Sequence, residues 1–366
     1  MLLAPLAAAA LVVTVATGPI TEPTALPALT LQQKNAAVQQ LVRSATECIA
    51  RTVAADPRFG HRELGDLIVD SMRTCVAEVR ASNWVRSRTR MPLRALLMGG
   101  MIRHMKTDLL LIPMSARWDD MRAAAVAADE AGFDGVWTWD HLRDPDGGSA
   151  PPEAWTALTA LAEATKRVML GPLVLNVANR HPGVLASMAA TLQTISGGRL
   201  LLGLGAGGSR RTPYAAEQAA IGQTVEGDAV RAQRVVDAIA LIRKLWKGEA
   251  GFLRPEPPPP IIVGGFGPRM AAIAGRHGDG FNTQAMHPQL ADLARTAREA
   301  HAASGREASS FTMTVFAGLE ERWLRADSRA RQMIERAGVD RLILLVSPPF
   351  DMDQIRQAGR LLTPAR

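Results

Sequence analysis

Asp140 and His141 are adjacent titratable residues that follow a short apolar run, and they are the first candidates for acid–base chemistry. If that run is a strand, alternation places Trp137 and Trp139 on one side and Thr138 and Asp140 on the other. A carboxylate beside an imidazole can exchange a proton near neutral pH. An aspartate that caps a loop, next to an exposed histidine, explains the same residues equally well.

A glycine-rich loop, Gly203-Leu204-Gly205-Ala206-Gly207-Gly208, matches G-x-G-x-x-G and follows an apolar run. In dinucleotide-binding folds this pattern occupies the first strand–helix turn and opens directly into a helix. Here it follows the fourth predicted strand, and the next predicted helix begins near Val230. We interpret it as a loop whose missing side chains let a flat ligand lie against the backbone. A tight turn at the rim of a barrel is the alternative.

A second glycine site, Gly264-Gly265-Phe266-Gly267, links an apolar strand to a helix that begins at Pro268. Free N–H groups and the helix dipole favour an anion at a helix N-terminus. Arg269 adds a positive charge nearby. The sequence therefore predicts a phosphate site here, with a purely structural turn as the alternative.

The composition limits the classes of function. No Ser-His-Asp arrangement, paired carboxylates or metal-ligand spacing stands out, so we expect no metal and infer that a bound cofactor carries the chemistry. The net charge of +7 is spread along the chain without the basic stripe of a nucleic-acid-binding surface. No apolar run reaches the length of a membrane span. We therefore expect a small-molecule substrate, no nucleic-acid partner and no membrane span.

From Met105 onward, apolar strands alternate with amphipathic helices. The strands are predicted at Leu109–Pro113, Gly135–Trp139, Val168–Leu175, Leu200–Gly205, Ile261–Gly264, Gly280–Gln284, Phe311–Ala317 and Leu342–Val346. The helices are predicted at Trp118–Ala131, Glu153–Thr165, Pro182–Ile195, Val230–Lys247, Pro268–Arg276, Pro288–Ala303, Ser328–Ala337 and Asp351–Leu362. Eight strand–helix units over residues 105–366 are typical of a (β/α)8 barrel, with ligands at the C-terminal ends of the strands. A doubly wound open sheet is the competing architecture.

The first hundred residues have a different character. Residues 1–30 are predicted to be a signal peptide or a disordered segment, 31–81 a helical hairpin, and 82–104 a linker. Cys48 and Cys75 fall one on each helix; they could pair if the protein is exported and would be buried hydrophobes in the cytoplasm. We expect a cytoplasmic protein, with export as the alternative. Met105 would itself make a start, so residues 1–104 are either an accessory region or a mis-assigned extension that the natural protein lacks.

Residues 105 to about 350 resemble the luciferase-like monooxygenase superfamily, and within it the coenzyme F420-dependent oxidoreductases. The segments that carry the resemblance, in the family's order, are Ala131–Trp137 before Asp140-His141-Leu142, Leu170–Ala186, Ser196–Gly208, and Ile261–Arg269 followed by Gly278–Asn282. The resemblance implies a TIM barrel of the bacterial luciferase-like type, to which the helical extension at the N-terminus is added.

The resemblance also implies where the cofactor would lie. Its ring would sit over the C-terminal rim near Asp140, Leu173, Val174 and Asn176, beside a bulge with a non-proline cis peptide bond around Pro172 to Val174. The remaining implied contacts are Ala206 and Gly207 with the ring or its side chain, Gly264 and Gly265 with the phosphate, and Phe266 and Arg269 beside them. His141 would be the proton donor, with Asp140 as the second catalytic residue.

Two positions depart from the family's pattern. Sugar-phosphate dehydrogenases of this family carry an acidic residue where this chain has Gly208, and a tryptophan is expected where Arg143–Asp146 stand. These departures argue against a sugar-phosphate substrate. The short segment between Gly318 and Asp327 predicts an open site, or one completed by the second subunit of a homodimer.

We therefore expect an enzyme, an oxidoreductase that transfers a hydride between coenzyme F420 and a small organic substrate. An FMN-dependent luciferase-like monooxygenase is the alternative within the family. Two alternatives belong to other classes. One is a Rossmann-type nicotinamide-binding protein with Gly203–Gly208 as its phosphate loop; the other is a non-catalytic, exported helical protein with a relic barrel.

Overall fold

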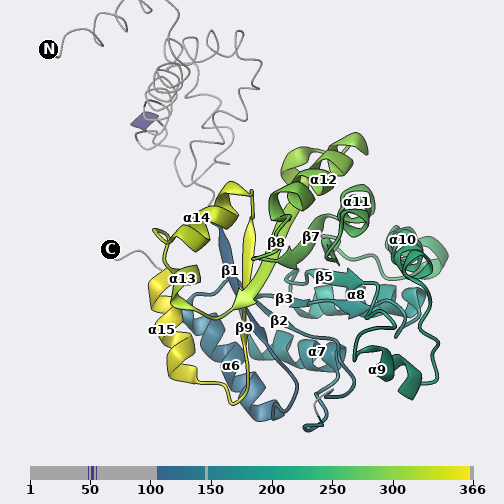
Figure 1. Cartoon of the computed structure of the whole chain (residues 1–366), viewed down its shortest axis with the longest axis horizontal. Coiled ribbons are helices and arrows are strands. Elements are labelled where there is room, and N and C mark those ends of the chain that lie inside the picture. The colour runs from purple at the N-terminus through teal and green to yellow at the C-terminus, as the bar shows by residue number, and fades with distance from the viewer. Residues whose placement is uncertain (1–47, 49–50, 53–54, 56–104, 145–146, 363–366) are drawn as a thin grey trace, which may run out of the picture. The chain divides into compact units, whose positions relative to one another are not determined.

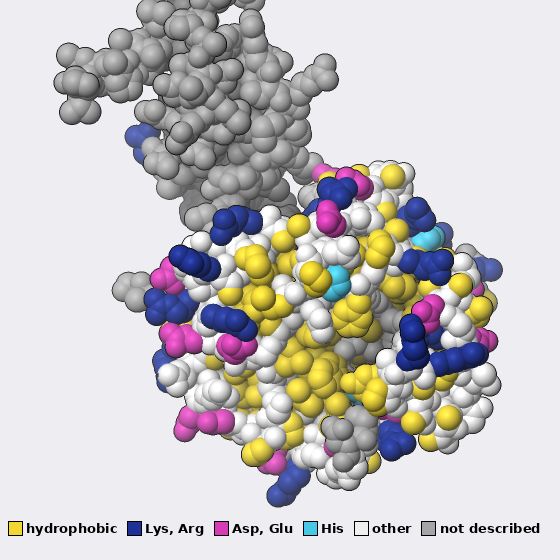
Figure 2. All heavy atoms as spheres, in the orientation of Figure 1, with side chains coloured by type: hydrophobic (Ala, Val, Ile, Leu, Met, Phe, Trp, Pro, Cys, Tyr) yellow, Lys and Arg dark blue, Asp and Glu magenta, His cyan; other side chains and the backbone are white. Residues whose placement is uncertain are grey.

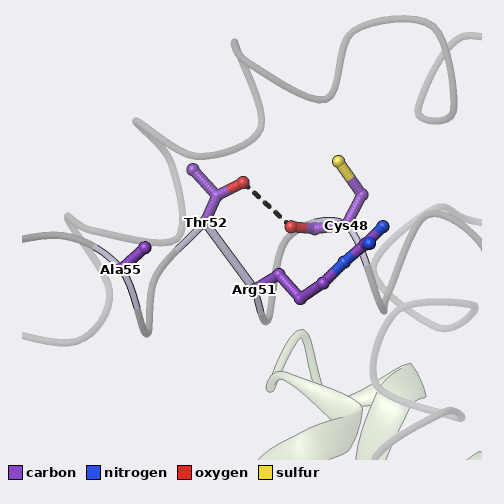
Figure 3. A pocket seen from close by; sticks show the side chains of 4 residues that line it. All are labelled: Cys48, Arg51, Thr52 and Ala55. Carbon is purple, nitrogen blue, oxygen red and sulfur yellow. Dashed lines mark hydrogen bonds between the residues drawn. The ribbon is translucent and has the colours of Figure 1, made fainter.

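The computed structural model describes residues 48, 51–52, 55, 105–144 and 147–362. The chain divides into two units, Met1–Arg103 and His104–Arg366. In the first unit, Cys48, Arg51, Thr52 and Ala55 line a pocket in which Thr52 Oγ1 donates a hydrogen bond of 2.9 Å to the Cys48 carbonyl oxygen (Figure 3). Cys48 is disulfide-bonded. The predicted signal or disordered segment, helical hairpin and linker otherwise lie outside the described residues, as does Cys75, and stay predictions.

The second unit is built on a parallel sheet whose strands are mostly buried, as expected of strands covered on both faces. The strands are β1 (Lys106–Leu111), β2 (Gly135–Thr138), β3 (Met169–Pro172), β4 (Leu175–Asn176), β5 (Leu202–Gly205), β6 (Ile261–Gly264), β7 (Gly280–Gln284), β8 (Thr312–Gly318) and β9 (Arg341–Val346). Neighbours in the sheet follow the order β3-β2-β1-β9-β8-β7-β6-β5-β4.

The sheet closes into a barrel because β3 and β4, at the two ends of that order, are successive pieces of one strand. The Leu170 N–H donates to the Arg199 carbonyl oxygen, and the Leu201 N–H donates to the Leu170 carbonyl oxygen, both at 2.8 Å. These bonds join β3 to the residues before β5, while β4 pairs with β5 itself. The predicted (β/α)8 barrel is confirmed, and the doubly wound sheet and the Rossmann-type alternative are excluded.

The third predicted strand, Val168–Leu175, is wrong as a single strand, because a cis peptide bond between Leu173 and Val174 interrupts it. This bond falls in the segment where the resemblance implied a bulge. The Val174 side chain lies against two glycines: its Cγ2 is 2.5 Å from the position of a Cβ at Gly205 and 2.9 Å from that of a Cβ at Gly264. Glycines at these two positions therefore make room for the bulge.

The helices form a ring around the barrel (Figure 1). They are α6 (Trp118–Ala131), α7 (Ala154–Ala164), α8 (Pro182–Ile195), α9 (Ala215–Ala220), α10 (Asp228–Leu245), α11 (Pro268–His277), α12 (Leu290–Ala303), α13 (Glu321–Leu324), α14 (Arg329–Arg336) and α15 (Met352–Leu362), with 3-10 turns η1 (Glu249–Gly251) and η2 (Ala308–Ser310). The eight predicted helices are present, two of them with the predicted bounds. The short helices α9 and α13 were not predicted. No helix in the described part of the chain combines the length and hydrophobicity of a membrane span.

The barrel interior has its own apolar cluster, whose buried members are Leu110, Trp137, Leu173, Leu201, Ile262 and Ile343. Below it, Arg341 Nη1 donates to both oxygens of Asp108 at 2.5 and 2.6 Å, and Trp137 Nε1 donates to Asp108 Oδ2 at 2.6 Å. Burial raises the pKa of Asp108, and the Arg341 guanidinium opposes that rise. These side chains fill the barrel near the N-terminal ends of its strands, which leaves the C-terminal ends for a ligand.

Gly203→Ala tests the packing of the bulge. A Cβ at Gly203 would lie 2.0 Å from the carbonyl oxygen of Pro172, so the bulge must shift. We expect the free energy of unfolding, measured in urea, to fall by about 1–3 kcal/mol or more. The matched control is Gly318→Ala, also in a strand, where the new Cβ would lie 3.9 Å from Glu320 Oε1, an ordinary van der Waals contact. Equal stabilities of the two variants would contradict this packing.

Candidate active site

Asp140, the second residue after β2, is held by an arginine from the segment that follows β4. Arg180 Nη1 and Nη2 donate to the two Asp140 oxygens, each at 2.8 Å, and the Asn176 N–H donates to Oδ2 at 2.9 Å. The Asp140 side chain is 1% exposed. Both carboxylate oxygens are thus engaged in fixing the end of β4. The predicted catalytic and cofactor-binding roles of Asp140 stay predictions, and its geometry is that of a residue that orients its neighbours.

Arg180 also pairs with Glu153, which precedes α7. Glu153 caps that helix, because its oxygens accept hydrogen bonds from the Trp155 N–H at 3.0 Å and the Thr156 N–H at 2.8 Å. Burial acts to raise the pKa of Glu153, but the hydrogen bonds from Thr156, Arg180 and Trp155 outweigh it and lower this pKa to about 2. One guanidinium therefore ties together the end of β2, the end of β4 and the start of α7.

His141 meets a carboxylate that sequence reasoning missed. Its Nδ1 lies 3.0 and 3.2 Å from the two oxygens of Glu217, on α9. The ring stacks on Tyr214 with centroids 4.5 Å apart, and Trp139 meets it edge-on at 6.0 Å. Glu217 was missed because α9 was not predicted; the signal was Pro213 before the helix-forming run Ala215–Ala220.

Arg231, on α10, binds the backbone of the first glycine loop. Arg231 Nη1 donates to the carbonyl oxygens of Ala206, Gly207 and Gly208 at 3.0, 2.6 and 3.1 Å. Gly207 has a φ of +71°, which favours glycine, and a Cβ there would lie 2.5 Å from Asn176 Nδ2. The loop is therefore fixed between Arg231 and the end of β4. Sequence reasoning also missed Arg231, whose position on a helix gives no sign of this contact.

The second glycine site lies beside the first. Gly264 contacts Val174, the Gly265 N–H donates to the Asn282 carbonyl oxygen at 3.0 Å, and Phe266 is 59% exposed. Gly267 caps α11 without a side-chain hydrogen bond, so the first N–H groups of that helix stay open to a ligand.

Cations gather where the two glycine sites meet. The pKa of Asp228 is lowered first by the hydrogen bond from Arg231 and also by the charges of Arg211 and Arg269. Arg269 is exposed. The predicted site residues therefore converge on the C-terminal ends of the strands; Leu173 directly follows β3, and its side chain is buried in the interior cluster. Within the described residues, no group of three or more His, Cys, Asp or Glu could hold a metal ion.

Glu153 gives a pH dependence of stability. Its pKa is lowered on folding from an ordinary 4.5 to about 2, so its contribution is fully present above pH 4.5 and fades as the pH falls toward 2. We expect the stability difference between wild type and Glu153→Gln, measured by urea unfolding, to be constant at higher pH and to shrink below pH 4.5. Glu130→Gln, at an exposed position on α6, is the control and should change stability little. A difference that grows on acidification would contradict the network.

Comparisons with known proteins identify the family of this chain. The family model for luciferase-like monooxygenases matches residues 100–364. An F420-dependent hydroxymycolic acid dehydrogenase of Mycobacterium tuberculosis is 35% identical over 52% of this chain and 56% of its own length. An F420-dependent glucose-6-phosphate dehydrogenase of Beutenbergia cavernae is 39% identical over 44% of this chain and 51% of its own. The chain thus spans about half the length of the curated relatives it matches.

Solved structures show the same fold. An F420-dependent secondary alcohol dehydrogenase, in complex with an F420-acetone adduct, superposes with a TM-score of 0.60 at 19% identity, over 71% of this chain and 99% of that one. A monooxygenase of Streptomyces bottropensis superposes with a TM-score of 0.55 at 23% identity, over 70% and 97% of the two chains. Together with the family match, the barrel and its rim show that this chain belongs to the luciferase-like monooxygenase family.

Proposed function

We propose that this protein is an oxidoreductase that transfers a hydride between coenzyme F420 and a small organic substrate. The observation that carries the proposal is the position of His141: an imidazole whose Nδ1 is paired with Glu217 stands at the rim that also carries the two glycine sites. Relatives that share this barrel are F420-dependent by name. The substrate itself stays open, since the names of those relatives give chemically different substrates.

The rim fits a flat cofactor with an anionic side chain. Val174 stands between Gly205 and Gly264 and would support one face of the ring, while Asn176, Ala206 and Gly207 would border it. The open N-terminus of α11, with Arg269 and Arg211 close by, would hold a phosphate.

Several buried polar atoms without a partner lie in the segments around the rim. In the described part of the chain, seven buried side-chain polar atoms lack a hydrogen-bond partner, and four of them belong to Asn179, Gln218, Gln223 and Arg231. All four residues lie on or beside the loops that follow β4 and β5. Buried polar groups are rarely left unpaired, so these segments keep hydrogen-bonding capacity that the described residues do not use.

When bound, F420 supplies a carbon that accepts or releases a hydride, so the protein needs to handle only a proton. His141 Nε2 has no hydrogen-bond partner among the described residues and is the group that would exchange this proton with the substrate oxygen. Asp140 and Arg180 would hold the end of β2 so that the imidazole keeps its place.

The second candidate is an FMN-dependent monooxygenase, which the description of the family favours. The same cradle of glycines would accept an FMN ring and its phosphate. The two candidates differ in the cofactor that the protein binds, and therefore in a measurement that requires no substrate.

The cytoplasmic location, the absence of a nucleic-acid partner and the homodimer also stay predictions. Light scattering of the full chain tests the homodimer.

Cofactor binding is the first test. We expect the full chain to change the absorbance or fluorescence of F420 on titration and to bind FMN more weakly. Tight FMN binding without F420 binding would overturn the proposal in favour of the monooxygenase, and binding of neither would favour the non-catalytic alternative.

Gly207→Ala should weaken F420 binding by about tenfold or more, because the new Cβ would collide with Asn176. Gly305→Ala is the matched control: Gly305 also has a positive φ, of +77°, but a Cβ there meets nothing within 4 Å. Both substitutions place a side chain at a positive φ and strain the backbone in the same way. The two variants therefore differ in whether the new Cβ collides with another residue. Equal affinities of the two variants for F420 would remove the first glycine loop from the cofactor site.

His141→Ala tests the proton exchange. We expect turnover to fall by about 10²–10⁴-fold while the affinity for F420 stays nearly unchanged, because the imidazole contributes acid–base chemistry rather than cofactor binding. His277→Ala, at the C-terminal end of α11, is the control and should keep wild-type turnover. Wild-type turnover in His141→Ala would eliminate this role.

A further inference from the structure

We propose that Glu217 is a positioning residue for His141: it holds the hydrogen of the imidazole on Nδ1, so that Nε2 is the nitrogen that exchanges a proton with the substrate. This inference rests on the proposed function. It assigns a role to a residue from the unpredicted helix α9, 76 positions after His141.

The carboxylate of Glu217 is committed to the imidazole. Its side chain is 7% exposed, and within the described residues His141 Nδ1 is its one hydrogen-bond partner. An ionised carboxylate can only accept hydrogen bonds, so the hydrogen in this contact belongs to Nδ1. In the neutral imidazole, Nε2 then carries the lone pair.

Two aromatic side chains fix the plane of the ring. Tyr214 stacks on it with an interplanar angle of 22°, and Trp139 meets it at 84°. Because Glu217 holds Nδ1 and these rings limit tilting, Nε2 keeps one direction. The three partners come from the end of β2 and from the segment around α9.

The segment after β5 folds back to deliver Tyr214 and Glu217, and Gly208 permits this fold. A Cβ at Gly208 would lie 2.6 Å from Thr212 Oγ1 and 2.7 Å from Tyr214 Cβ. A side chain at this position, acidic or otherwise, would push Tyr214 off the imidazole. Gln223 Nε2 donates to the Ala178 carbonyl oxygen at 2.7 Å and so anchors the far end of α9 to the segment after β4.

With the hydrogen held on Nδ1, Nε2 of His141 is the atom that takes up or returns the substrate proton. In the oxidative direction, Nε2 would accept the hydroxyl proton of an alcohol substrate, and F420, when bound, would supply the acceptor for the hydride of the carbon that bears this hydroxyl; loss of both would leave a carbonyl compound. The imidazole is then positively charged between the substrate and the Glu217 carboxylate, which stabilises that charge. The reverse reaction returns the proton from Nε2 to the oxygen.

The test is the tautomer of His141 in the full chain without cofactor, read from imidazole ¹⁵N chemical shifts at alkaline pH and assigned with His141→Ala. We expect the Nδ1–H form in wild type. In Glu217→Gln the side-chain amide can donate to Nδ1, so the ring should switch to the Nε2–H form. Glu226→Gln, which removes the ion pair with Arg234, is the matched control and should leave the tautomer unchanged.

An Nε2–H ring in wild type, or an Nδ1–H ring in Glu217→Gln, would overturn the inference. If Glu217→Gln fails to fold, Glu217→Asp takes its place: it keeps the carboxylate and should keep the Nδ1–H form, and loss of that form would count against the role of the charge. In the loaded enzyme, Glu217→Gln should lower kcat by about 10²-fold and change the affinity for F420 by less than about twofold.

These measurements separate the two proposals. If the protein does not bind F420, the proposed function is wrong. The role of Glu217 in holding the hydrogen on His141 Nδ1 can still be tested, because the tautomer is measured without cofactor. An unchanged kcat in Glu217→Gln, together with the expected loss in His141→Ala, would remove the role of Glu217 and keep that of His141.

Discussion

The two hydrogen bonds between Arg180 and Asp140 are the contact on which the arrangement of the rim depends. A buried carboxylate after β2 is neutralised by a guanidinium from beyond β4, and the same carboxylate receives the Asn176 N–H. Removing one member of such a buried pair typically costs about 3–5 kcal/mol, because the other charge is left without compensation. The bond to Asn176 fixes the piece of strand that follows the cis peptide bond, and His141 is attached directly to Asp140.

The other site features follow from that fixed point. Asn176 packs against Gly207, and Arg231 holds the carbonyl groups of Ala206, Gly207 and Gly208 from the opposite side. Arg211 and Arg269 lie close to Asp228, the carboxylate that pairs with Arg231, so positive charge collects between the two glycine sites. Figure 2 shows hydrophobic side chains gathered over the middle of the ring of helices. The exposed Phe266 packs edge-on against Phe316. The rim thus combines apolar side chains with cations, the two kinds of group that a ring with an anionic side chain requires.

Much of the barrel could be predicted because its strands and helices are encoded locally. Apolar runs and amphipathic periodicity located all eight strand–helix units, and α6 and α8 end where Gly132 and the Ser196–Gly198 segment permit a C-terminal turn. The break in the third strand was not visible in its apolar run, because it depends on room made by glycines of two other strands. Arg180, Glu217 and Arg231 were missed for a similar reason: their partners lie 40, 76 and 23 to 25 positions away, and sequence spacing does not show which of many charged residues will meet. Gly208 was interpreted as a missing acidic group; the structure shows that it makes room for the segment that brings Glu217 to His141.

In the proposed function, the ends of β4, β5 and β6 together form the F420 site. Hydrogen–deuterium exchange of the full chain, with and without F420, tests it most directly, because slowed exchange locates the ligand on the backbone without any substrate. We expect slower exchange in three segments, 173–177, 205–208 and 264–270, with little change near the N-terminal ends of the strands. Unchanged exchange in these segments, or slowing confined to another part of the chain, would contradict it.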